Sequence, residues 1–233
     1  MKGIKFGNKH SYDDFGLLLS SKTIGQASVK TNLVEIEGAD GVLDLTEALS
    51  GRPTYSTRPL SFAFTIMDAP PDRLKKHSKV SNYMHGQKMP IILDDDPDYY
   101  YIGRISVGDL SESNGYATIQ VDVDAQPYKY ATLNSTEGWI WDPFCFEDGI
   151  AQDPTEYTVN GTLEVNVLGG AEVIVPEFIT DGAMTISCAG VSHTVSKAGT
   201  YRWYDILFLD EGTYKIVFTG TGTVTVNYRR NIL

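Results

Sequence analysis

Large apolar residues alternate with small or polar ones along much of the first half of the chain. This period of two is typical of half-buried β-strands. The segment LSFAFTI (60–66) shows it most clearly, because every second residue from Leu60 to Ile66 is large and apolar. The segment ATIQVDVDAQPY (117–128) repeats the pattern. Apolar runs bounded by turn residues predict further strands at 16–21, 27–38, 88–93 and 99–107.

One segment of the first half, APPDRLKKHSKVSNYMHG, has a different character. Two prolines open it, Asp72 falls in the expected first turn, and Gly86 closes it. These are start and stop signals of a helix. The sequence therefore predicts one helix over about 71–85, with an apolar stripe formed by Leu74, Val80, Tyr83 and Met84.

The second half consists of short strand-like segments separated by Gly, Asn and Asp. Spacings of about 8–12 residues with turn residues between them favour a β-sandwich. The segment PYKYATLNSTEGWIW (127–141) breaks the alternation and is interpreted as a junction. We therefore expect a mainly β protein with two domains, 1–130 and 131–233, and one helix in the first.

The formal net charge of −11 argues against nucleic-acid binding, which requires clustered Lys and Arg. The charge is uneven. Residues 1–130 carry 14 basic and 17 acidic side chains, and residues 131–233 carry 5 and 13. No segment has the roughly 18 consecutive apolar residues of a membrane span. The first residues lack the apolar core of a signal peptide, so we expect synthesis in a cytoplasm without membrane insertion.

The stretch LDDDPDYYYIGRI (93–105) is the strongest candidate for chemistry, because Asp94, Asp95, Asp96 and Asp98 gather there. A metal site, a catalytic carboxylate pair and a turn between strands are the alternatives. Asp and Pro are favoured in turns, and Pro97 lies within the stretch. The glycine and the distal glutamate of a calcium loop are missing. We therefore favour the turn.

Other catalytic patterns are absent from the sequence. There is no HExxH, no G-x-S-x-G and no CxxC, and His77 and His85 stand too far apart for a helical metal pair. The segment GTGTVTVN (220–227) ends in a strand and is interpreted as a hairpin, not as a phosphate loop. Cys145 and Cys188 are interpreted as buried free thiols in preference to a single disulfide. No enzyme activity, metal or cofactor is expected.

Aromatic residues in the second half support an alternative function. Trp139, Trp141 and Trp203 are candidates for stacking against saccharide rings on an acidic β-sandwich. The competing interpretation places the same rings in the core and at the domain junction.

The ordered series of motifs resembles the distal tail proteins of long-tailed bacteriophages that infect Gram-positive hosts. SYDDFGLLLSS resembles the opening of that family, and IEGADGVLDLTEALSGRPTYSTRPLSFAFTI resembles its glycine-rich loop and following strand. MPIILDDDPDYYYIGRISV is similar to its strand–acidic turn–strand unit, and VDAQPYKY to the end of its first domain. In the second half, VNVLGGAEVIVPEFITDGAMTIS and GTGTVTVNYRRNIL complete the resemblance, whereas 131–160 carries no matching motif. The glycine-rich loop unit matches at Gly38, Gly41, Asp44, Tyr55, Arg58 and Phe64.

The resemblance implies a fold and a role. It implies a ring-forming, β-barrel-like N-terminal domain that assembles as a homohexamer at the virion tail tip, and a galectin-like C-terminal β-sandwich. Such a ring joins the tail tube protein to the host-adsorption protein, without catalysis. For this chain the resemblance makes the acidic stretch a candidate intersubunit contact, with Asp95, Asp96, Asp98, Tyr100, Arg104 and Arg58 as its residues.

Overall fold

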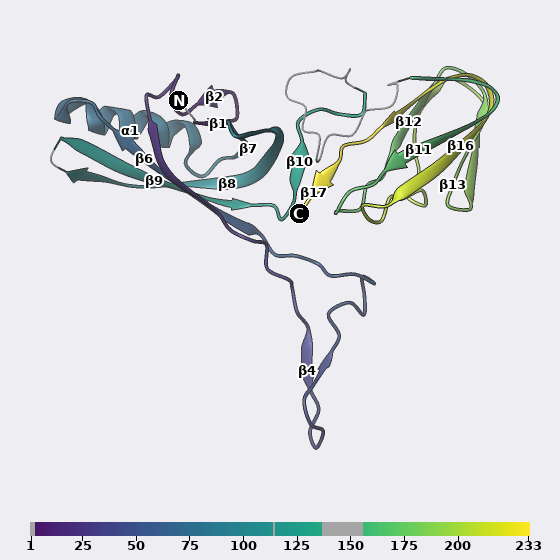
Figure 1. Cartoon of the computed structure of the whole chain (residues 1–233), viewed down its shortest axis with the longest axis horizontal. Coiled ribbons are helices and arrows are strands. Elements are labelled where there is room, and N and C mark those ends of the chain that lie inside the picture. Colours follow the sequence, from purple (N-terminus) through teal and green to yellow (C-terminus); the bar gives the residue numbers. More distant parts are fainter. Residues whose placement is uncertain (1–2, 114, 137–155) are drawn as a thin grey trace. The chain divides into compact units, whose positions relative to one another are not determined.

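The computed structural model describes residues 3–113, 115–136 and 156–233, and within them the chain is mainly β with one helix (Figure 1). The predicted fold class is confirmed at this level. The chain divides into two compact units. Unit 1 comprises Met1–Asp96 and Tyr100–Lys129, and unit 2 comprises Pro97–Tyr99 and Tyr130–Leu233.

Unit 1 is built on an antiparallel sheet with the strand order β2-β1-β7-β8-β9-β6-β3. Its strands are β1 (Ile4–Phe6), β2 (Lys9–His10), β3 (Leu18–Ile24), β6 (Arg58–Ile66), β7 (Lys88–Leu93), β8 (Asp96–Ser113) and β9 (Tyr116–Ala125). The strand predicted at 60–66 is therefore β6, and it pairs with β9 residue by residue from Arg58↔Ala125 to Ile66↔Ala117.

One face of this sheet forms the core of unit 1. Along β6, the residues of the predicted apolar face are fully buried while those between them are half-buried or exposed. The rings of Phe62 and Phe64 both meet Phe6 of β1 edge-on, with ring centroids 6.1 and 6.2 Å apart. Burying each such side chain stabilises the folded state by about 1.5–3 kcal/mol. Burial of this face therefore stabilises the pairing of the strands.

Helix α1 (Pro70–Met84) covers the core, within one residue of its predicted bounds. The two prolines occupy its first turn, where their missing N–H groups cost no hydrogen bond. Val80 and Met84 are buried in the core of unit 1, and the Tyr83 hydroxyl donates to the Phe6 carbonyl at 2.9 Å. The prediction was wrong for Leu74, whose side chain is 63% exposed beside the buried face of the helix.

The segment between β3 and β6 forms a two-stranded arm, made of β4 (Leu33–Glu35) and β5 (Val42–Asp44) (Figure 1). The strand predicted over 27–38 is therefore only three residues long, and it pairs with β5 instead of joining the main sheet. We call residues 28–56 the arm, because hydrogen bonds from Ser56 to Ser28 and from Lys30 to Thr54 close its base.

Unit 2 is a second antiparallel β structure. Its main sheet has the order β14-β13-β16-β12-β15, with β11 paired along β16. The strands are β11 (Tyr157–Leu168), β12 (Glu177–Thr180), β13 (Met184–Cys188), β14 (Val191–Val195), β15 (Gly199–Arg202) and β16 (Thr213–Asn227), and the short β10 (Lys129–Ala131) pairs with β17 (Asn231–Ile232). Phe178, Phe208 and Phe218 are fully buried at its centre.

The hairpin predicted at 220–227 is wrong. Strand β16 runs without a break from Thr213 to Asn227, and β11 pairs with it in one register through Gly161↔Gly220. A Cβ atom on Gly220 would lie 2.8 Å from the Ala183 carbonyl oxygen. The glycines therefore allow the segment before β13 to approach β16 closely, and they do not reverse the chain.

We expect Gly220→Ala to lower the free energy of unfolding by about 1–3 kcal/mol, because alanine is strained at φ +151° and lacks space beside Ala183. Urea denaturation followed by circular dichroism measures the change. Thr221→Ala, at the exposed neighbouring position, is the matched control and should stay within about 0.5 kcal/mol of the wild type. Equal stability of both variants would contradict the close-approach role of Gly220.

Asp181 makes unit 2 sensitive to acid. The Thr223 N–H donates to its Oδ1 at 2.6 Å, and the backbone and side-chain hydrogen bonds of Thr223 lower the pKa of Asp181. A lowered folded-state pKa gives stability above the unfolded-state pKa that is lost as the pH falls through the folded-state value. Unfolding of Asp181→Asn should therefore depend less on pH below about 4 than unfolding of the wild type. Identical acid dependence would refute this.

Candidate functional site

The aspartates singled out in the sequence lie at a tight turn between β7 and β8. Asp94 and Asp95 form the turn, and Leu93 pairs with Asp96 across it. The chain thus reverses where Asp and Pro favour it. The three consecutive carboxylates then contact three different parts of unit 1, and we call Asp94–Asp96 the acidic turn.

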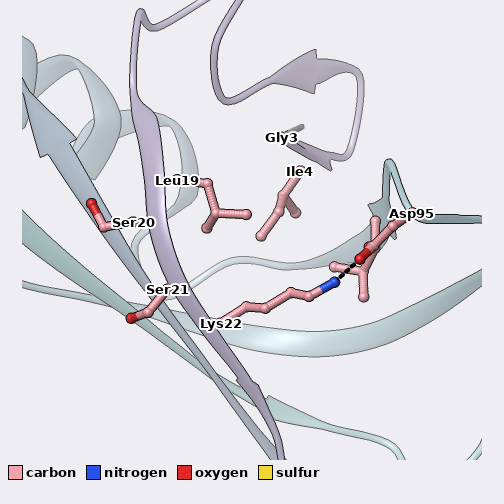
Figure 2. A pocket seen from close by; sticks show the side chains of 8 residues that line it. Gly3, Ile4, Leu19, Ser20, Ser21, Lys22 and Asp95 are labelled. Carbon is pink, nitrogen blue, oxygen red and sulfur yellow. Dashed lines mark hydrogen bonds and ion pairs between the residues drawn. The ribbon is translucent and has the colours of Figure 1, made fainter. Parts of the chain in front are cut away.

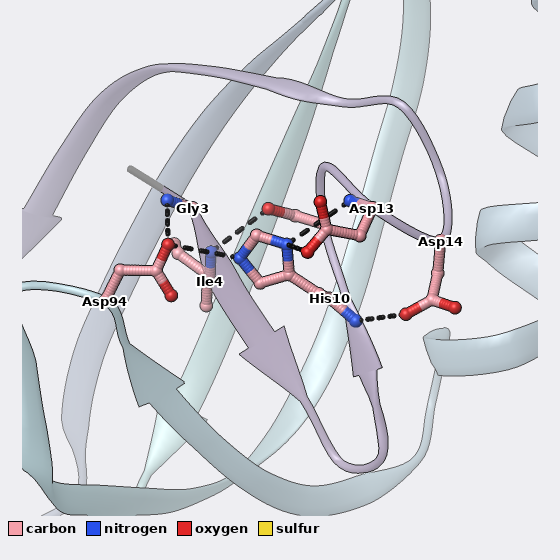
Figure 3. A network of polar contacts seen from close by, with 7 residues as sticks. Gly3, Ile4, His10, Asp13, Asp14 and Asp94 are labelled. Carbon is pink, nitrogen blue, oxygen red and sulfur yellow. Dashed lines mark hydrogen bonds and ion pairs between the residues drawn. The ribbon is translucent and has the colours of Figure 1, made fainter. Parts of the chain in front are cut away.

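Asp94 holds the N-terminal hairpin (Figure 3). Its Oδ2 accepts the Gly3 N–H at 2.6 Å and lies 3.2 Å from Nε2 of His10. The other ring nitrogen of His10 lies 3.0 Å from Oδ2 of Asp13, and the His10 backbone N–H donates to Asp14 at 2.7 Å. The imidazole therefore stands between two carboxylates, one from its own hairpin and one from the acidic turn.

Asp95 forms an ion pair with Lys22 of β3 (Figure 2). Because β3 is the last strand in the sheet order, this pair shows that the sheet curls back toward its other edge. A cavity of about 290 Å³ lies beneath the pair, lined by Gly3, Ile4, Leu19, Ser20, Ser21, Lys22, Leu93 and Asp95. Its walls present one paired cation and one paired anion, which leaves no charged group in it to select a ligand.

The third carboxylate, Asp96, lies 2.5 Å from Nζ of Lys129, where the chain leaves unit 1. The next residues belong to unit 2, in which the Asp98 carbonyl accepts the Thr132 N–H at 2.7 Å. The acidic turn therefore has an intramolecular role in addition to the contact predicted for it. It fastens the N-terminus, the edge strand β3 and the exit from unit 1.

The remaining predicted contact residues lie in other environments. Arg104 is exposed and donates to the Gly86 carbonyl at 2.6 Å. Tyr100 is half-buried, whereas Arg58 is only 4% exposed and its guanidinium lies 5.8 Å from the Tyr101 ring centroid. The six candidates therefore do not form one exposed surface, and an intersubunit role for them stays a prediction.

In the described ranges, no group of three or more His, Cys, Asp or Glu side chains is placed to hold a metal ion. Nor does any helix there have the length and apolar character to cross a membrane. Cys188 is a free, buried thiol, and burial raises its pKa. Cys145 lies outside the described residues.

Of the three candidate saccharide-stacking residues, only Trp203 lies within the described residues, whereas Trp139 and Trp141 do not. The imidazole of His193 stacks parallel to the Trp203 ring with centroids 4.6 Å apart, and Tyr201 stacks at 5.7 Å. Asp205 holds His193 in place through a 2.9 Å contact to Nε2. The indole is therefore already stacked against other aromatic rings of the chain.

The arm is the functional candidate that sequence reasoning missed. Cross-strand pairing places Val34 opposite Leu43 on one face of the arm, and places Leu33 opposite Asp44 on the other. Its large apolar side chains are exposed to solvent, and they are Val29, Leu33, Val34, Ile36, Val42, Leu43 and Leu49. A run of contiguous exposed apolar residues marks an interaction site. The apolar residues of LVEIEGADGVLDL were visible in the sequence, but their lack of a covering layer was not.

With this geometry established, the chain can be compared with known proteins. No protein-family model matches it, and no curated protein matches it in sequence. Among solved structures, the whole chain shares its fold with a phage adsorption-hub protein. That protein is the Dit protein of phage SPP1, described as a paradigm of the hub adsorption apparatus in phages that infect Gram-positive bacteria. The match covers 100% of both chains with a TM-score of 0.67 and 13% identity. At this identity the likeness shows a Dit-like β fold.

We expect Asp94→Ala to destabilise the protein by about 1–3 kcal/mol, because it leaves the buried Gly3 N–H without its acceptor. Asp95→Ala removes only a partly exposed ion pair and should cost about 0.2–1 kcal/mol. Chemical denaturation measures both, with Asp109→Ala on the exposed face of β8 as the control. A larger effect at Asp95 than at Asp94 would show that the ion pair dominates the acidic turn.

Proposed function

We propose that this protein is a structural, non-enzymatic component of a phage or prophage tail tip, which self-assembles into a ring that connects the tail tube to the host-adsorption apparatus. The observation that carries the proposal is the arm. A single chain leaves the apolar side chains of the arm in water on both of its faces. The fold shared over the full length with a phage adsorption-hub protein supports the same conclusion.

Self-assembly is the simplest way to cover the arm. A two-stranded ribbon is marginally stable alone in water, and three or more strands or a packed face are needed to stabilise it. The arm comprises 29 residues (28–56), or about 14 on each side, so at about 3.3 Å per residue it reaches at most roughly 45 Å from its base. The arm is therefore long enough to reach a neighbouring subunit. A contact between an arm and a different surface of the next copy is heterologous, and such contacts generate a closed ring when the rotation between successive copies closes.

The two parts of the chain differ in net charge, and we use this difference to assign their roles in the ring. Residues 1–130 are nearly balanced, with 14 basic and 17 acidic side chains, so copies of this part repel each other little. Residues 131–233 carry most of the net charge, with 5 basic and 13 acidic side chains. We assign the ring to the N-terminal domain, and assign the outward position, in the form of a galectin-like sandwich, to the C-terminal domain. The tail tube protein and an adsorption protein are the proposed partners of the ring.

Light scattering coupled to size exclusion, over a series of protein concentrations, tests the ring. We expect a mass approaching that of six 25.7 kDa chains, and particles with a central hole in electron micrographs. A monomer at every concentration would contradict the proposal.

The variant Leu33→Ser/Val42→Ser should lose the ring while the monomer keeps its fold, because both side chains are exposed in a single chain and lie on the same face of the arm. Scattering mass and circular dichroism report the two properties separately. Ile179→Ser, which changes an exposed apolar residue on β12 of unit 2, is the control and should assemble normally. If the arm variant assembles like the wild type, the arm is not the ring contact.

Saccharide binding by the C-terminal domain is the alternative function, and the structure offers it less support. Trp203 is half-buried and stacked against His193, so it presents less of its ring than a stacking platform requires. A glycan array that shows binding, and loss of that binding in Trp139→Ala or Trp203→Ala, would establish this function instead.

A further inference from the structure

We infer that the receptor for the arm is the outer face of helix α1 on a second copy of this chain. The inference rests on the proposed ring and specifies which two surfaces form it. It follows from the chemistry of the two surfaces. Both carry exposed apolar residues, and the arm is acidic whereas the helix is basic.

The outer part of the arm is acidic as well as apolar. Positions 33–47 contain five acidic residues and no basic one, namely Glu35, Glu37, Asp40, Asp44 and Glu47. On one face, the cross-strand register brings Leu33 and Val42, each 53% exposed, together with Glu35 and Asp44. A surface that covers this mixed face must offer apolar area and positive charge together, since an uncompensated carboxylate is costly to desolvate.

Helix α1 offers that combination. Four of the 19 basic residues of the chain fall within positions 73–79, and Asp72 is the only acidic residue of the helix. Arg73 is buried, but Leu74, Lys75, Ser78 and Lys79 lie on the exposed face at helical spacing. Met67, which is 62% exposed and precedes the helix by three residues, is a further exposed apolar side chain at the start of this region.

The intramolecular contacts of the two lysines leave them available. Lys75 makes an i,i+3 contact with Asp72, but its side chain remains 79% exposed. Lys79 donates to the Asp14 carbonyl at 3.3 Å, close to the upper limit for a hydrogen bond, and its Nζ lies 5.5 Å from the Phe15 ring centroid. Exposed contacts of this kind contribute little to stability. Both amines can therefore turn to carboxylates of another copy at small cost.

The pairing of the arm with helix α1 also explains how successive copies are oriented in the ring. The arm and the helix are different surfaces of one chain, so each copy offers its arm to one neighbour and its helix to the other. Charge complementarity across such a contact selects the register and the partner more than it sets the affinity. The aliphatic stems of the lysines would lie along Leu33 and Val42 while the amines reach Glu35 and Glu37.

Charge reversal in two separate chains tests the contact. Glu35→Lys/Glu37→Lys and Lys75→Glu/Lys79→Glu should each raise the protein concentration needed for half-assembly by roughly tenfold or more. A 1:1 mixture of the two variants should restore assembly, because reversed arms meet reversed helices and wild-type arms meet wild-type helices around an alternating ring. Rescue by mixing also shows that neither variant is misfolded.

Lys197→Glu/Lys215→Glu in unit 2 makes the same change in net charge as the helix variant, and serves as the control that should assemble normally. Zero-length carbodiimide cross-linking of mixed ¹⁵N- and ¹⁴N-labelled wild-type chains should join Glu35 or Glu37 of one copy to Lys75 or Lys79 of another. A ring that forms but shows neither rescue nor these cross-links overturns this contact alone. A wild-type chain that stays monomeric overturns the ring and the contact together.

Discussion

Burial of one face of the antiparallel sheet is the constraint on which unit 1 depends. Because successive side chains of a strand point to opposite faces, a one-residue slip of β6 against β9 would expose Phe62 and Phe64 and bury their polar neighbours. This fixes the register of the central strands. Once β6, β9 and β8 are in place, Phe6 packs between the two phenylalanines and α1 covers the core with Val80 and Met84.

The acidic turn provides directional polar contacts, which hydrophobic burial of the core does not provide. Apolar contact is not directional, so it does not decide how the two ends of a curled sheet meet. Asp94 contacts Gly3 and His10 near one edge of the sheet, and Asp95 contacts Lys22 on the edge strand β3. A cluster of aspartates that suggested metal binding or catalysis therefore has a structural explanation. Each carboxylate has a separate partner, which keeps like charges from sharing one site.

The arm stands in contrast to the rest of unit 1. Elsewhere in the described part of unit 1, most large apolar side chains are covered by the chain itself and the exposed ones are scattered (Tyr12, Met67, Leu74 and Tyr116), whereas along the arm seven are exposed. A protein that keeps such a segment in water accepts a risk of aggregation unless a specific partner covers it. The proposed ring would cover these side chains, and the acidic residues along the arm favour its hydration until a complementary surface is met. The fold shared with a phage adsorption-hub protein and the exposed apolar arm are the two observations on which the proposed function rests.

Local periodicity determined much of this fold. It predicted β6, β7, β9 and α1 close to their observed bounds, because those elements satisfy their own pattern against a single core. The turn at Asp94 and Asp95 was likewise predictable, since it depends on the backbone preferences of adjacent residues.

Properties that arise between distant segments were decided only by tertiary structure. The prediction failed at 220–227, where Gly220 and Gly222 make room for neighbouring chain instead of turning it. It also missed that 27–38 leaves the sheet to form an arm, that Leu74 faces solvent, and that the partners of the acidic turn lie as far as 91 positions away in the sequence. The apolar pattern indicates which residues favour burial, but only the folded chain shows which of them are buried.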